Sequence, residues 1–183
     1  MAPATTERVL DRLWLTAETE HPSQLYVILD AARDKRIYPK LADSDIECVP
    51  LHRGAKAKEL ATVGPYLVKL DRDHPFTTWL FDNGWGRSWG IFFESSAGLN
   101  ELKRHFQTFL VVHDEEGKHL YFRYYDPRVF RVYLPTCNES ELNIVFGPVR
   151  CYLIEGEDTT SMVEYRFNDG RLSQQVVLMR DSA

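Results

Sequence analysis

The stretch GIFFESSAGLNELKRHFQTF, residues 90–109, joins the two clearest structural signals in the sequence. Its first six residues, 90–95, are mostly apolar and typical of a buried strand. The remainder has apolar residues at the spacing of one helix face: Leu99, Leu102, Phe106 and Phe109. Ser95 or Ser96 could serve as the N-cap of this helix. A strand followed directly by an amphipathic helix predicts a sheet that is covered by helices.

The same alternation of short apolar runs and helical segments extends upstream. Strands are predicted at 24–29, 47–51 and 66–70, and helices at 30–42, 56–61 and 75–82. We expect Asp30 to be the N-cap of the first of these helices, and Pro39 to bend or interrupt it. Another helix is predicted near the start of the chain, with Thr5 or Thr6 as its cap.

After residue 109 the predicted elements are hairpins and short helices. The runs FLVVH (109–113) and HLYFRYY (119–125) flank the turn sequence DEEGK, so residues 109–125 predict an antiparallel hairpin. Asp126 followed by Pro127 is a strong helix-start signal. We expect the apolar face of that helix to consist of Val129, Phe130, Tyr133 and Leu134. A further helix (139–146), the apolar run VRCYLIE (149–155) and a hairpin around NDG (168–170) follow.

These elements predict a mixed α/β fold, with a central sheet, flanking helices and an antiparallel hairpin in the second half. An α+β arrangement is the alternative. The sequence is divided into an N-terminal helix (1–24), a core domain (25–149) and a C-terminal strand or hairpin extension (150–183).

Composition and charge narrow the functional classes. The 183-residue chain carries a net charge of −5, which disfavours general binding to nucleic acid because phosphate contacts need a basic surplus. Three cysteines, odd in number and far apart, indicate free thiols in a reducing compartment. We find no apolar run long enough to span a bilayer, and charged residues stand where a signal peptide needs apolar ones. We therefore expect a cytoplasmic protein that does not bind membranes.

Catalytic and metal motifs are weak. GRSWG (86–90) matches the G-x-S-x-G pattern of hydrolases around Ser88, but a loop is predicted before the serine and a strand after it, whereas the nucleophile elbow needs a strand first. His113 and His119 flank an acidic turn without the spacing of a metal site. We therefore expect a protein that is not an enzyme, with no metal, cofactor or small-molecule substrate. A small serine hydrolase using Ser88 is the alternative.

The stretch YFRYYDPRVF, residues 121–130, interleaves aromatic and basic side chains. As a strand it would place Tyr121, Arg123 and Tyr125 on one face, a composition typical of protein interfaces. The arginine could equally be held by a carboxylate such as Asp126 inside the fold, and base stacking is a third use of such residues. The candidate partner-binding residues are Tyr121, Arg123, Tyr125, Arg128 and Trp85, and the structural motif comprises Asp30, Asp126 and Pro127.

Five stretches together resemble one protein family. They are LYVILDAARD (25–34), GPYLVKLD (64–71), WGIFFESSAGLNELKRHF (89–106), GKHLYFRYYDPRVF (117–130) and FGPV (146–149). In this order they resemble the effector chaperones, or adaptors, of bacterial type VI secretion. The resemblance implies a non-enzymatic protein that binds a toxic effector and promotes its loading onto the spike protein VgrG. Phe106 stands where leucine is commoner in the family, and the chain after Val149 follows no family pattern.

Overall fold

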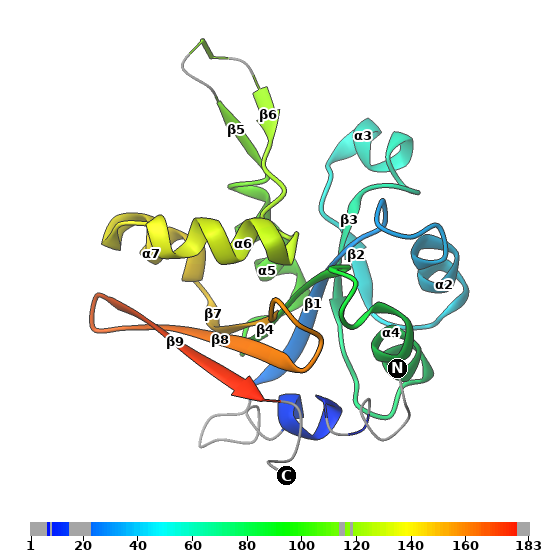
Figure 1. The fold of residues 1–183 in the computed structure, drawn as a ribbon. Helices are drawn as coiled ribbons and strands as arrows, with labels where there is room; N and C mark the ends of the chain where they lie inside the picture. Colours follow the sequence, from blue (N-terminus) through cyan, green and yellow to red (C-terminus); the bar gives the residue numbers. More distant parts are fainter. Residues whose placement is uncertain (1–6, 8, 15–22, 114–115, 118, 179–183) are drawn as a thin grey trace.

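The computed structural model describes residues 7, 9–14, 23–113, 116–117 and 119–178. Over these residues the main sheet has seven strands in the order β2-β3-β1-β4-β7-β8-β9, and every neighbouring pair is antiparallel (Figure 1). The strands are β1 (Gln24–Asp30), β2 (Cys48–Pro50), β3 (Pro65–Lys69), β4 (Gly90–Ser95), β7 (Val149–Glu155), β8 (Ser161–Asn168) and β9 (Arg171–Leu178). The mixed α/β fold class is therefore confirmed.

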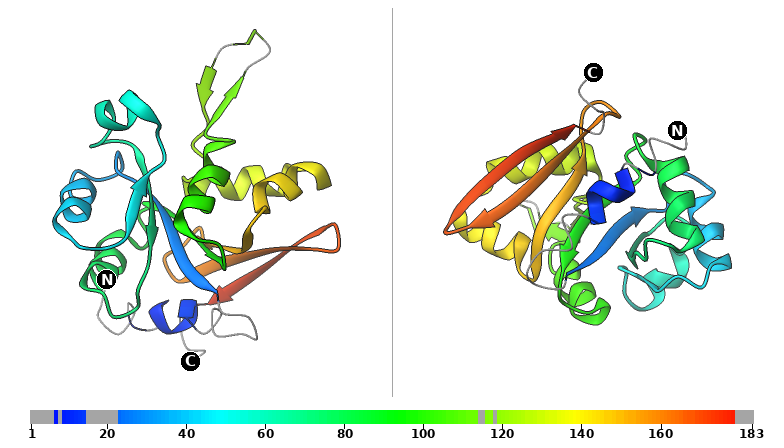
Figure 2. Two further views of the ribbon diagram at one scale, coloured as in Figure 1. Left: turned by 180° about the vertical axis from the view of Figure 1, so that it is seen from behind. Right: turned by 90° about the horizontal axis from the view of Figure 1, so that it is seen from below.

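Helices connect most of these strands, and a small hairpin stands apart from them. The helices are α2 (Ile37–Asp43), α3 (Gly54–Glu59), α4 (Pro75–Gly84), α5 (Leu99–Gln107), α6 (Pro127–Tyr133), the 3-10 turn η1 (Leu134–Thr136) and α7 (Glu139–Phe146). The hairpin pairs β5 (Val111–His113) with β6 (His119–Tyr121). It projects away from the rest of the molecule (Figures 1 and 2).

The interior strand β1 is buried on both faces, and its side chains alternate between two apolar clusters. Val27 and Leu29 belong to a cluster with the N-terminal helical residues 9–14, α2 and α4. Tyr26 and Ile28 belong to the opposite cluster, with α5, α6 and α7. In Figure 1, α6 and α7 lie on one side of β7–β9 and the N-terminal helical residues lie on the other. The molecule thus has three layers, with helices on both faces of the sheet.

Strand register places the ends of three strands together. Leu29 of β1 is the register partner of Gly90 at the start of β4, and Phe92 of β4 is the partner of Leu153 in β7. Because neighbouring strands run in opposite directions, the carboxyl ends of β1 and β7 and the amino end of β4 lie at the same end of the sheet. Residues 149–178, expected partly as an extension, supply β7, β8 and β9 of this same sheet.

Two local expectations around α2 were wrong. Asp30 is the last residue of β1, and α2 begins only at Ile37, so Asp30 caps no helix. Pro39 lies in the first turn of α2 and does not interrupt it, because a first-turn N–H has no partner within the helix. The residues expected as the first cap, Thr5 and Thr6, lie outside the described residues.

The expected cap of α5 also differs. Its N-cap is Gly98, which makes no side-chain hydrogen bond. The Ser95 hydroxyl instead donates to the carbonyl of Pro148 at 2.7 Å and accepts from the Ala97 amide at 3.0 Å. The serine therefore joins the end of β4 to the start of β7. In the part of the chain that the structure describes, no helix is long and apolar enough to cross a membrane.

The close contact between β1 and β4 at Gly90 yields a stability prediction. A Cβ built on Gly90 would collide with the backbone carbonyl of Ile28. We expect Gly90→Ala to lower the free energy of unfolding by about 3 kcal/mol or more, because two paired strands would have to separate. Gly98→Ala is the control, since a Cβ there meets no atom within 4 Å and only the preference for glycine at the N-cap is lost, about 1 kcal/mol or less. Urea denaturation of both variants checks this, and equal midpoints would contradict it.

Candidate functional site

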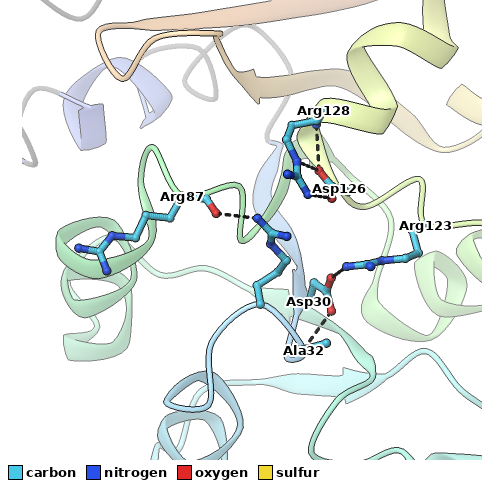
Figure 3. Close-up of polar contacts among 7 residues, drawn as sticks. Asp30, Ala32, Arg87, Arg123, Asp126 and Arg128 are labelled. Atoms are coloured by element: carbon cyan, nitrogen blue, oxygen red, sulfur yellow. Dashed lines mark hydrogen bonds and ion pairs between the residues drawn. The ribbon is translucent and has the colours of Figure 1, made fainter.

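The stretch 121–130 turns from β6 into α6, and its helix-start signal is confirmed. Asp126 is the N-cap of α6, with Pro127 directly after it, and its Oδ1 accepts the backbone N–H of Arg128 at 3.0 Å. The Arg128 guanidinium also donates to both oxygens, at 2.9 Å from Nε and 2.6 Å from its terminal nitrogen (Figure 3). Burial alone would raise the pKa of Asp126, but these hydrogen bonds from Arg128 hold it below the usual value.

A second carboxylate connects this stretch to β1. Asp30 is almost fully buried, and its Oδ2 forms an ion pair with Arg123, while its Oδ1 accepts the Ala32 amide at 3.0 Å (Figure 3). An arginine held by a carboxylate was one of the open interpretations, although the partner is Asp30 rather than Asp126. The pair joins the end of β1 to the segment that leads into α6.

A third buried carboxylate, Glu155, ends β7 at the same end of the sheet. Its Oε2 accepts the backbone N–H of Ser88 at 3.0 Å. Arg131 of α6 donates to the backbone carbonyls of Glu155 and Gly156, the latter at 3.2 Å. Burial raises the pKa of Glu155 to about 7. We call Asp30, Asp126 and Glu155, with the donors that bind them, the polar junction.

The aromatic candidates do not share one strand face. Strand β6 ends at Tyr121, and the chain then turns, with the Asp126 amide donating to the carbonyl of Arg123 at 3.1 Å. This turn leaves Tyr121 and Arg123 exposed but buries Tyr125. Trp85 is also buried, and its indole N–H donates to the Thr159 carbonyl at 3.1 Å. Tyr125 and Trp85 therefore support the fold from within and are not part of an exposed surface.

The exposed side of α6 carries apolar residues that sequence analysis missed. Val132 is 73% exposed and Ile144 on α7 is 60% exposed. A shallow groove of about 630 Å³ runs along this side of α6, which we call the α6 groove; it is lined by Asp126, Arg128, Val129, Val132, Tyr133 and Thr136. Val129 was expected in the core, yet it faces outward, while Phe130 and Leu134 are buried. The i, i+3 spacing of Val129 and Val132 was the only sequence signal for this second apolar face.

Neither Ser88, the residue of the hydrolase alternative, nor the pair His113 and His119 lines the α6 groove. Ser88 follows α4 and precedes β4, which is the reverse of the strand–serine–helix order of a nucleophile elbow. His113 and His119 are register partners in the hairpin. Among the described residues, no three His, Cys, Asp or Glu side chains gather in a way that could hold a metal ion.

Comparison with known proteins identifies the family. The model of a family described as a domain of unknown function, DUF4123, matches residues 25–143. The chain belongs to this family. The match runs from β1 into α7 and includes Asp30, Arg123 and Asp126, whereas Glu155 lies beyond it. No curated protein and no solved structure shows significant similarity to the chain.

The cap at Asp126 can be tested separately from its ion pair. We expect Asp126→Ala to lower the free energy of unfolding by about 1 kcal/mol, because the first turn of α6 loses its acceptor. Asp126→Asn keeps a capping oxygen and loses only the charge, so it should cost less than half as much. Thermal melting of both variants checks this, and equal losses would mean that the ion pair with Arg128, not the cap, stabilises α6.

The raised pKa of Glu155 predicts a pH dependence. From its ordinary value of 4.5 up to about 7, the folded protein binds a proton that the unfolded chain releases, so stability falls as pH rises through this window. The loss amounts to at most about 3 kcal/mol. Glu155→Gln cannot titrate, so we expect its melting temperature relative to wild type to rise between pH 5 and pH 8. A difference that stays constant with pH would contradict this.

Proposed function

We propose that this DUF4123 protein is a non-enzymatic chaperone or adaptor of a bacterial type VI secretion system. It binds one toxic effector in the cytoplasm and promotes the loading of that effector onto the VgrG spike. The observation that carries the proposal is the α6 groove, an exposed apolar surface on the helix that begins in the stretch (117–130) resembling the adaptor family.

The positions of the five stretches that resemble the adaptor family support this proposal. Four of them coincide with β1, β3, β4–α5 and β6–α6, so they form the sheet core and the segment that leads to the groove. The fifth, residues 146–149, connects α7 to β7. The resembling stretches therefore include the framework and the first part of the groove lining, Asp126, Arg128 and Val129.

The chemistry of the α6 groove suits a protein partner. Val129, Val132 and Tyr133 offer apolar area, and Arg128 at one end offers a guanidinium that is more than half exposed. Apolar and aromatic area beside an arginine is typical of interface hot spots. The polar junction fixes the start of α6, so little conformational freedom is lost when a partner binds.

Deletion of the gene in its native bacterium tests the proposal. We expect one effector to disappear from the secreted proteins while the tube protein of the secretion system is still released. Affinity purification of the tagged protein should recover that same effector, with or without VgrG. Unchanged secretion of every effector in the deletion strain would overturn the proposal.

The role of the α6 groove is tested by a point variant. We expect Val132→Asp to reduce recovery of the effector at least about tenfold, because a charge would be placed in an apolar contact. Val63→Asp is the matched control, since Val63 is also exposed but lies in the turn before β3. Ser88→Ala should bind the effector normally. Equal recovery with Val132→Asp and Val63→Asp would remove the groove from the contact surface.

A further inference from the structure

A second concave surface lies between α3 and the base of the β5–β6 hairpin. Both elements extend from the same end of the molecule (Figure 2). The opening between them has a volume of about 380 Å³, and its lining includes Leu51, His52, Arg53, Lys56, Leu110 and Tyr121. We call it the hairpin pocket. It shares no residue with the α6 groove.

The walls of the hairpin pocket are held together by polar contacts. Gln107 at the end of α5 donates to the Leu51 carbonyl at 2.8 Å and accepts from Nε of Arg53 at 2.8 Å. Lys56 Nζ donates to the Tyr121 hydroxyl at 2.7 Å and lies 5.1 Å from the centre of its ring. These contacts fix Tyr121 although it is 45% exposed, so the pocket is formed before any partner arrives.

The charge of the pocket is opposite to that of the protein. Arg53 and Lys56 are exposed cations, and their hydrogen bonds go to neutral groups of Gln107 and Tyr121. Of the ion pairs in the described part of the chain, none uses either residue, and no carboxylate lines the pocket. A cationic pocket on a chain of net charge −5 provides a specific attraction for a negative group.

The floor of the pocket and its surroundings are apolar. Leu51 and Leu110 are buried at the pocket lining, and the His52 ring meets the Tyr121 ring edge-on with centroids 5.3 Å apart. Val111 and Tyr121, register partners at the base of the hairpin, line the pocket, whereas Val112 and Leu120 lie on the opposite face of the hairpin. The two exposed cations beside these apolar groups complement an acidic segment of a protein partner.

We infer that the hairpin pocket binds an acidic segment of the effector, with a carboxylate on Arg53 and Lys56 and an apolar side chain against Val111 and the exposed Tyr121 ring. This inference rests on the proposed function and adds the chemistry of the client. Arginine and lysine bind carboxylates through charge-assisted hydrogen bonds, and the Tyr121 ring provides a rigid wall for the apolar side chain. Exposed cations chiefly raise the association rate and set specificity.

Charge reversal tests the inference with the complete protein and its effector. We expect the double variant Arg53→Glu with Lys56→Glu to bind the effector at least about tenfold more weakly than wild type, with less dependence on salt. Its melting temperature should fall only slightly, because both side chains are exposed and each loses one surface hydrogen bond. Lys35→Glu is the matched control, because Lys35 is exposed in the turn before α2.

A photo-crosslinking residue in place of Val111, which lines the pocket, then identifies the occupant. We expect it to capture an effector segment that carries Asp or Glu beside an apolar residue. If wild type recovers no effector, the proposed function itself fails. If wild type and the double variant bind equally, or the captured segment is basic, only the inference fails. A wild-type dimer that the double variant dissociates would assign the pocket to a second copy of the chain and overturn the inference.

Discussion

Burial of β1 on both faces is the constraint on which the rest of the structure depends. This strand pairs with β3 on one side and β4 on the other, and its alternating side chains enter both apolar clusters. Each helical layer is therefore anchored to the same seven residues. Because a shift of one residue would exchange the two faces, the register is strongly specified. Asp30, at the end of this strand, is consequently fixed in position before any surface contact is considered.

The polar junction connects the end of β1 to α6, which lies at the surface. Asp30 binds Arg123, Asp126 caps α6, and Glu155 holds the backbone before β4. Buried carboxylates are unfavourable unless they are hydrogen-bonded or paired, and here each has donors from another segment or from the helix it caps. Burying these carboxylates costs desolvation free energy, and their hydrogen bonds and ion pairs fix the orientation of α6 relative to the sheet.

The stretch 121–130 links the two surfaces that we propose for partner binding. Tyr121 forms a wall of the hairpin pocket, and Arg128 lies at one end of the α6 groove. The two surfaces differ in chemistry, since the groove is mainly apolar and the pocket is cationic. Apolar contacts supply most of the free energy of association, whereas exposed charges accelerate encounter and select the partner. A client that uses both surfaces would need an apolar segment for the groove and an acidic segment for the pocket.

The sequence by itself determined the elements whose signals are local. Periodicity predicted β4 and α5, and Asp126 with Pro127 predicted the start of α6, because caps and apolar repeats act within a few residues. Only the tertiary structure decided the antiparallel strand order and the exposure of Val132. It also decided that Arg123 pairs with Asp30, which is 93 residues away in the sequence. Pairing between distant segments depends on how whole layers pack, and no local pattern contains that information.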